Sequence, residues 1–316
     1  NLTLYFFSNI MNEIRVFSPA TVSNVACGFD ILGFPLDSVG DEMVVRKTIA
    51  KGIIITKIEG YDLPFDINKN VASVSAMALL DVAKPDFGFE IEIYKKIKPG
   101  SGIGSSGASA TSSVYALNEL LGRPFNKLQL TEFAMKGELI SSNSEHADNI
   151  APALFGGFTM VKSLNPLEVL QLPTLKDLFV VIIHPQIEIK TSESRGILPK
   201  MVSLSDATKQ MSDLGGLIHA LHTSDYKLLK KSLNDHLVEK HRSKLIPYFD
   251  ELKSKSLAAG AIGCSISGSG PSVFALVKGK QMAINIELIF NSIYSKSNID
   301  FATYVSKISS DGVIAI

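Results

Sequence analysis

A glycine-rich segment between a strand pattern and a helix pattern constrains this chain most. Residues 89–94 alternate apolar and polar side chains, as a half-buried strand does. Apolar residues recur at three- and four-residue steps from Ala110 to Leu121, which predicts a helix. The intervening loop, 99–107, therefore lies at a helix N-terminus, where unpaired N–H groups and the positive dipole end favour an anion such as a phosphate chain. It consists of Pro99, Gly100, Ser101, Gly102, Ile103, Gly104, Ser105, Ser106 and Gly107.

The residues of this loop leave two interpretations open. The loop can be a plain strand-to-helix connection, or its amides and hydroxyls can hold a phosphate. Residues 102–107 form a G-x-G-x-x-G string. Dinucleotide-binding folds, however, place these glycines directly after the strand, with an acidic residue at the end of a second strand about 20 positions on. Neither condition holds here, and the chain also lacks the G-K-[ST] ending of a P-loop.

Composition narrows the class of partner. The 316 residues are 46% hydrophobic, enough for two packed domains. Lys plus Arg and Asp plus Glu number 31 each, so no excess positive field favours nucleic acid or an anionic membrane. We therefore expect small-molecule partners, no nucleic acid and no membrane. The two distant cysteines favour a cytoplasmic location, and residues 1–10 resemble a vector-derived remnant before a native start at Met11.

The order of predicted elements suggests how the domains divide. In the first half we expect strands at 42–48 and 52–58, a helix at 71–82, and a second helix that Thr131 caps. The second half predicts strands at 178–184, 261–267, 272–277 and 302–308, with helices at 203–221, 226–237, 247–258 and 282–294. This order is the split βαβ pattern of ferredoxin-like domains. We expect domains at 11–165 and 166–316.

Three segments, in order, resemble the three motifs of the GHMP kinases. Loop 99–107 resembles the phosphate loop, which contains G-L-G-S-S-A-A, with Ile103 in place of leucine and Gly107 in place of the first alanine. Residues 18–30 resemble the first motif, and residues 263–272 the third. S-N-x-x-x-G-F-D at 23–30, together with E-H-A-D-N-I-A-P at 145–152, is similar to the branch that acts on homoserine.

The resemblance implies an α+β fold with two domains. A ribosomal-protein-like N-terminal domain would bind ATP with Mg²⁺ through loop 99–107, and a ferredoxin-like domain would follow. Ser106 and Glu138 match the magnesium partners of the family, and a hydroxyl and a carboxylate suit this hard cation. Asn70 matches a position near the nucleoside. Without the resemblance, Ser106 and Asn70 are equally consistent with helix caps and Glu138 with an exposed helix residue.

The resemblance also implies a pocket for a zwitterionic amino acid. Asn24 and Asp30 match the family's contacts to the amino end and the hydroxyl. Arg195 and Arg242 match its carboxylate clamp, a task that suits guanidinium groups. Other positions of the same cleft are His146, Asn149 and Thr191. From the residues alone, the two arginines could instead be exposed surface cations, and His146 could have a purely structural role.

The implied reaction is transfer from ATP to the side-chain hydroxyl of L-homoserine, giving O-phospho-L-homoserine and ADP in threonine biosynthesis. Other branches place an aspartate base where this chain has Asn149. We therefore expect catalysis by Glu138, Ser106 and Asn149 without a dedicated base, driven by positioning and charge stabilisation. A change of Glu138 should then reduce the chemical step strongly. The neighbouring Asp148 and His146 leave a side-chain base open; without such a base, a change of Asp148 should leave kcat nearly intact.

Three other functions stay open at this point. The same fold could phosphorylate mevalonate, a sugar or another small alcohol. It could also be an inactive binding protein, although such a protein would be expected to lose the metal carboxylate or the phosphate loop. Nucleic-acid binding is weakened by the balanced charge and the absence of tryptophan. The family is often dimeric, which implies a homodimer.

Overall fold

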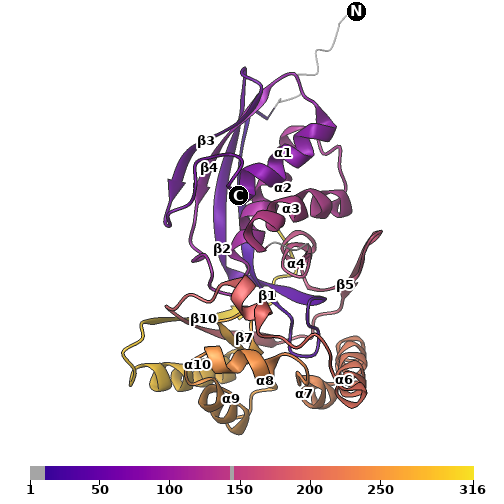
Figure 1. The fold of residues 1–316 in the computed structure, drawn as a ribbon, viewed down its shortest axis with the longest axis vertical. Helices are drawn as coiled ribbons and strands as arrows, with labels where there is room; N and C mark the ends of the chain where they lie inside the picture. The colour runs from indigo at the N-terminus through magenta and orange to yellow at the C-terminus, as the bar shows by residue number, and fades with distance from the viewer. Residues whose placement is uncertain (1–10, 143–145) are drawn as a thin grey trace, which may run out of the picture.

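The computed structural model describes residues 11–142 and 146–316, so the expectation for residues 1–10 lies outside the described residues. Two sheets with packed helices form the protein (Figure 1). The first half contributes helices α1 (Val71–Ala83), α2 (Ser105–Leu120), α3 (Lys127–Ser142) and α4 (Ile150–Phe155). Its sheet, within the described residues, has seven strands: β1 (Glu13–Ser23), β2 (Leu32–Thr48), β3 (Gly52–Glu59), β4 (Gly88–Tyr94), β5 (Phe158–Leu164), β6 (Leu167–Leu172) and β11 (Ile314–Ala315).

The long strand β2 organises the first sheet. The order is β11-β1-β2-β4-β3, and β5 pairs with the start of β2 and with β6. β3 lies parallel to β4, and the other pairs are antiparallel. Helices α1, α2 and α3 lie against one face of this sheet (Figure 1). Val45, Phe89 and Ile91 pack there with Leu79 and Val114, so the alternation of β4 and the helical spacing of α2 meet in one core.

The second sheet has the strand order of a ferredoxin-like domain. It contains β7 (Leu178–Pro185), β8 (Gly263–Ile266), β9 (Val273–Lys278) and β10 (Phe301–Lys307), all antiparallel, in the order β10-β7-β9-β8. This confirms the expected α+β class. Helices α9 (Phe249–Ala258) and α10 (Lys280–Tyr294) cover one face. The remaining helices are α5 (Thr191–Gly196), α6 (Leu204–Thr223), α7 (Tyr226–Ser232), α8 (Glu239–Arg242) and a 3-10 turn at Ser243–Leu245.

The two halves share a hydrophobic core. Val22 and Phe34 of the first sheet pack with Val180 of the second, and the rings of Phe34 and Phe274 lie 6.2 Å apart. Strand β11 returns the C-terminus to the first sheet, in the upper part of Figure 1. The predicted boundary at 165/166 falls within the β5–β6 hairpin and stays a prediction.

Some local predictions are wrong, for identifiable reasons. β1 was not predicted; it extends to Ser23, and the turn after it begins where Asn24, Val25 and Ala26 adopt positive φ. Thr131 does not cap α3, which begins at Lys127; its hydroxyl donates to the Lys127 carbonyl one turn earlier. β5 and β6 were not predicted, because each strand is short and Pro166 lies in the turn between them.

Candidate active site

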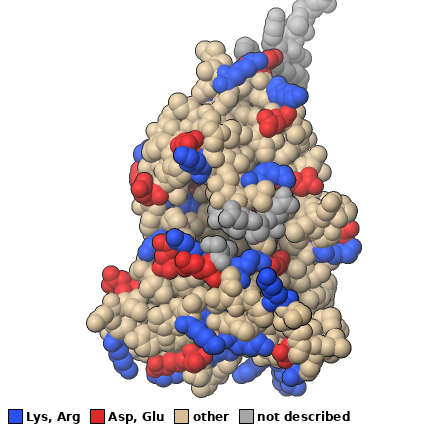
Figure 2. All heavy atoms as spheres, in the orientation of Figure 1, with Lys and Arg blue, Asp and Glu red and all other residues tan. Residues whose placement is uncertain are grey.

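A cavity of about 380 Å³ lies between the two halves and gathers most of the predicted site residues. Figure 2 shows the molecule hollowed at mid-height, with charges of both signs around the hollow. The wall is built by the β1–β2 turn, the start of α1, loop 99–107, the end of α3, the start of α4 and three parts of the second half, which contain Arg195, Arg242 and Gly268. The predicted residues that line it are Asn24, Asp30, Asn70, Pro99, Gly100, Ser101, Gly102, Gly104, Ser105, Ser106, Glu138, His146, Asn149, Arg195 and Arg242.

Two described positions of loop 99–107 fall outside this lining, and two further residues of the prediction cannot be placed relative to it. Ile103 is buried at 1% exposure and belongs to the shared core, so it anchors the loop from behind. Gly107 lies in the first turn of α2, facing the Asn149 side chain. Thr191 begins α5, and its side chain lies outside the described part of the structure. Glu145 of the predicted motif also lies outside the described residues.

The backbone of loop 99–107 requires its glycines. Gly100, Gly102 and Gly104 all adopt φ between 71° and 79°. A Cβ on Gly104 would lie 2.0 Å from the Thr21 hydroxyl, and one on Gly102 would lie 2.6 Å from the Gly270 carbonyl. Gly104 is also the N-cap of α2 and has no side chain with which to cap the first-turn amides. The loop therefore presents backbone N–H groups at a helix start, as an anion site requires.

The third motif holds the loop from the second half. The Ser272 hydroxyl donates to the Ser101 carbonyl at 2.6 Å, and the Ser267 hydroxyl donates to the Gly102 carbonyl at 2.7 Å. Both carbonyls therefore bond to residues at the β8–β9 connection. Because neutral hydroxyls satisfy them, no carbonyl is left to repel an anion at these two positions.

An ion pair joins the first motif to α5. The guanidinium of Arg195 donates to both carboxylate oxygens of Asp30 at 2.8 and 3.1 Å. Asn24 holds the turn: its amide oxygen accepts from the Asp30 N–H at 2.9 Å, and its amide group donates to the Gly268 carbonyl at 2.7 Å. His146 lies 4.0 Å from Asp30, and burial lowers the pKa of its imidazole. The structure thus brings these predicted substrate residues together.

A second guanidinium lies beside the first. Arg242 is only 2% exposed and donates to the carbonyls of Ser194 and Gly268 at 3.2 and 3.0 Å. The guanidiniums of Arg242 and Arg195 lie 5.2 and 5.5 Å from the ring centre of Phe29. Burial, and secondarily the charge of Arg195, lower the pKa of Arg242 to about 10. Two neighbouring cations in a recessed wall favour an anionic group.

Asn149 is fixed by the first strand. Its amide oxygen accepts from the Thr21 hydroxyl at 2.7 Å, and its amide group donates to the Ser23 hydroxyl at 3.0 Å. The adjacent Asp148 is buried, and burial together with the nearby Asp30 raises its pKa to about 7. Asn149 is therefore rigidly placed and carries no charge, while Asp148 is the titratable neighbour.

Glu138 and Ser106 face the same cavity from two helices. Glu138 lies near the end of α3 with 9% exposure, and Ser106 is the second residue of α2. Among the described residues, no group of three or more His, Cys, Asp or Glu side chains could hold a metal alone. One carboxylate and one hydroxyl form a hard oxygen donor set, which fits Mg²⁺ that takes its other ligands from phosphate and water.

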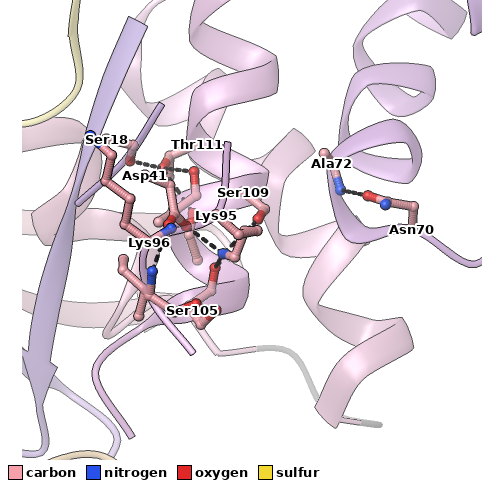
Figure 3. A network of polar contacts seen from close by, with 12 residues as sticks. Ser18, Asp41, Asn70, Ala72, Lys95, Lys96, Ser105, Ser109 and Thr111 are labelled. Atoms are coloured by element: carbon pink, nitrogen blue, oxygen red, sulfur yellow. Dashed lines mark hydrogen bonds and ion pairs between the residues drawn. The ribbon is translucent and has the colours of Figure 1, made fainter. Parts of the chain in front are cut away.

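Asn70 is a helix cap that also lines the cavity. Its side-chain oxygen accepts from the Ala72 N–H at 3.0 Å (Figure 3), and its amide group donates to the Pro64 carbonyl at 2.9 Å. The Asn70 side chain therefore caps α1, which is one of the roles that the sequence left open.

Sequence reasoning missed two charged residues beneath the phosphate loop. Lys95 and Asp41 form an ion pair with side chains 1% and 2% exposed (Figure 3). A lysine directly after an alternating strand is ordinarily exposed, so no pattern in the sequence indicated this pair.

Comparisons with known proteins agree with this geometry. The GHMP kinases N terminal domain matches residues 70–157, and the GHMP kinases C terminal domain matches residues 217–296. A homoserine kinase from Chlorobium phaeobacteroides (strain BS1) is 38% identical over 97% of this chain and 100% of its own length. The chain belongs to the GHMP kinase family, in its homoserine kinase branch.

Two solved structures are similar to this chain, to different degrees. The crystal structure of homoserine kinase from Cytophaga hutchinsonii is 46% identical and has a TM-score of 0.95, covering 99% of this chain and all of that one. Mevalonate kinase from L. major, solved with R-mevalonate, has a TM-score of 0.72 and 16% identity, covering 93% of this chain and 96% of that one. At that identity the likeness shows the fold alone. GHMP kinases use ATP as a substrate. No described helix is long and apolar enough to cross a membrane.

Proposed function

We propose that this chain transfers the γ-phosphate of ATP to the side-chain hydroxyl of L-homoserine, a step of threonine biosynthesis. The observation that carries the proposal is that one cavity holds both a glycine-built anion loop and, on its other wall, a carboxylate beside two guanidiniums. A nucleotide phosphate fits the first wall. A zwitterionic amino acid fits the second.

The acceptor would bind between Asp30 and Arg195 and break their ion pair. Its ammonium would take the place of the guanidinium at Asp30, and its carboxylate would bind Arg195 and Arg242. Asp30 and Arg195 pair with each other before the substrate arrives, so neither of these partly exposed charges lacks a partner in the ligand-free protein. A neutral alcohol could not replace both partners, so the pocket selects an amino acid.

The phosphate chain would lie against loop 99–107. Amides at the start of α2 would donate to phosphate oxygens, and Ser106 with Glu138 would hold Mg²⁺. When bound, this ion neutralises phosphate charge. Asn70 would border the nucleoside while it caps α1.

No side chain is assigned as a dedicated base. Asn149 cannot accept the hydroxyl proton as a base, and its amide is held by Thr21 and Ser23, which fits an orienting role. In a loose phosphoryl-transfer transition state the acceptor proton leaves late, so in-line positioning and charge stabilisation provide most of the rate.

The test is ATP consumption by the purified chain with Mg²⁺ and a panel of L-homoserine, L-serine, L-threonine, mevalonate and galactose. We expect selective turnover of homoserine. Faster turnover of another alcohol would retain a kinase but reject this acceptor pocket, and ATP binding without any turnover would favour the inactive binding protein.

Asp148 provides a test of catalysis without a base. For Asp148→Asn we expect kcat within about threefold of the unsubstituted chain at pH 6 to 9. If Asp148 accepts the proton, kcat of the unsubstituted chain instead falls below about pH 7, and the variant loses activity at every pH. A collapse of kcat in a folded variant would contradict the proposal.

The same variant tests the burial of Asp148 through stability. Because the folded-state pKa is raised to about 7, the native state binds more protons than the unfolded state between about pH 4 and 7, and stability falls as pH rises through that window. Relative to the unsubstituted chain, the Tm of Asp148→Asn should therefore rise with pH from 5 to 8. A difference in Tm that does not change with pH would contradict this.

Two finer expectations accompany the proposal. Buried free cysteines Cys27 and Cys264 suit a reducing, cytoplasmic setting. A homodimer stays a prediction from the family resemblance.

A further inference from the structure

We infer that Lys95 and Asp41 are a positioning pair that sets the shape of the phosphate loop before the nucleotide binds. The inference rests on the proposed function, because it assigns a role within the ATP site. Neither residue belongs to a motif that the sequence analysis singled out. Their burial beneath loop 99–107 is the observation that needs an explanation.

The pair lies where the loop leaves the sheet. Asp41 belongs to β2, and Lys95 follows β4 directly; Glu42 of β2 and Tyr94 of β4 are cross-strand partners, which brings the two side chains together. Burying both charges costs several kcal/mol per ion unless every donor and acceptor is satisfied. A gain in stability is therefore not a sufficient explanation for this buried ion pair, and we look for a specific role.

The carboxylate of Asp41 fixes the strand side of the loop. One of its oxygens accepts from the backbone N–H groups of Lys96 and Ile97, at 2.7 and 2.9 Å. The other oxygen accepts from the Lys95 ammonium. Two consecutive residues of the connection between β4 and the loop are thus held by one side chain.

The ammonium of Lys95 fixes the helix side. It donates to the Ser105 carbonyl at 2.7 Å and to the Ser109 hydroxyl at 3.0 Å, so with Asp41 its three protons are all used. Ser105 is the first residue of α2, and its own hydroxyl donates back to the Ile97 carbonyl at 3.0 Å. One closed network therefore joins the two ends of the glycine loop.

A loop with three glycines at positive φ loses much conformational entropy when it is ordered. The network orders the loop in the ligand-free protein, so the binding of ATP does not carry the entropic cost of ordering it. Lys95 also lines the cavity, which places a cation behind the amides that would receive the phosphates. The Lys95 ammonium lies at the N-terminal end of α2, where the helix dipole is also positive. The carboxylate of Asp41 neutralises the charge of Lys95 and so removes this repulsion.

The variant Lys95→Met/Asp41→Asn tests the inference, because it removes both charges together and leaves no unpaired ion. We expect the Kd for ADP with Mg²⁺, by calorimetry, and the KM for ATP to rise about tenfold or more. The KM for homoserine should stay within about twofold. A purely structural pair would instead lower Tm and leave all three constants unchanged, which would overturn the inference.

The matched control is Ile286→Ala, in the core between α10 and the second sheet, which lowers stability without touching the loop. It should keep the unsubstituted affinity for ADP; an equal loss there would contradict a specific role for the pair. If the double variant does not fold, Ser109→Ala removes one partner of Lys95 and should raise the Kd for ADP about threefold, and no rise would overturn the inference. Failure of the unsubstituted chain to bind ADP would reject the proposed function instead.

Discussion

Replacing Glu138 by glutamine should lower kcat for homoserine phosphorylation by about 10²- to 10³-fold. Glu138 is the one predicted metal carboxylate, and it faces the cavity from the end of α3 at 9% exposure. The glutamine variant keeps the volume and removes the negative charge that would hold Mg²⁺ beside Ser106. Initial rates at saturating ATP and homoserine, over a range of Mg²⁺ concentrations, measure the effect.

Helix α3 offers a matched control for this change. Glu132 lies on the same helix but is exposed, so Glu132→Gln should leave kcat unchanged. The homoserine KM should change little in either variant, because Glu138 is assigned to the nucleotide side. A folded Glu138→Gln variant with nearly normal kcat at every Mg²⁺ concentration would remove Glu138 from the metal site.

The second large effect is expected at Arg195. Replacing it by methionine should lower kcat/KM for homoserine about 100-fold and leave the KM for ATP unchanged, because a charge-assisted hydrogen bond contributes about 1.5–3 kcal/mol. Arg195 is suited to this test because its side chain is 35% exposed, so the fold should tolerate the change better than a change of the buried Arg242. Steady-state kinetics with each substrate varied separately gives both constants.

Arg123→Met is the control for loss of a cation. Arg123 pairs with Glu119 on the surface, and its side chain is 72% exposed. The kinetic constants of the Arg123→Met variant should therefore match those of the unsubstituted chain. If Arg195→Met raised the KM for ATP and left kcat/KM for homoserine unchanged, the nucleotide and the acceptor would have been assigned to the wrong walls of the cavity.

Local signals in the sequence predicted the elements that build the site. The helical spacing after Asn70 predicted 71–82, and α1 spans Val71–Ala83 because Asn70 caps it. The glycine loop and the helix after it were placed correctly, since glycine spacing and apolar period are properties of neighbouring residues. The order of elements after residue 178 was sufficient for the ferredoxin-like sheet.

Contacts between distant residues could not be predicted this way. Asp30 and Arg195 are 165 positions apart, and only the family resemblance placed them in one pocket. Lys95 and Asp41 were missed because each alone has the pattern of an exposed charge, and only the pairing of β2 with β4 buries them together. The side-chain bonds of Asn149 to Thr21 and Ser23 likewise depend on packing between α4 and β1.

Identification of the phosphorylated atom tests the central claim most directly. The purified chain would be incubated with ATP, Mg²⁺ and L-homoserine, and the product analysed by phosphorus NMR with proton coupling. The account predicts one new phosphomonoester signal, split by the two protons of the terminal CH₂–O group. Inorganic phosphate alone, or an acyl phosphate on the homoserine carboxylate, would contradict it, because the proposed arrangement holds that carboxylate at Arg195 and Arg242 and leaves the hydroxyl to react.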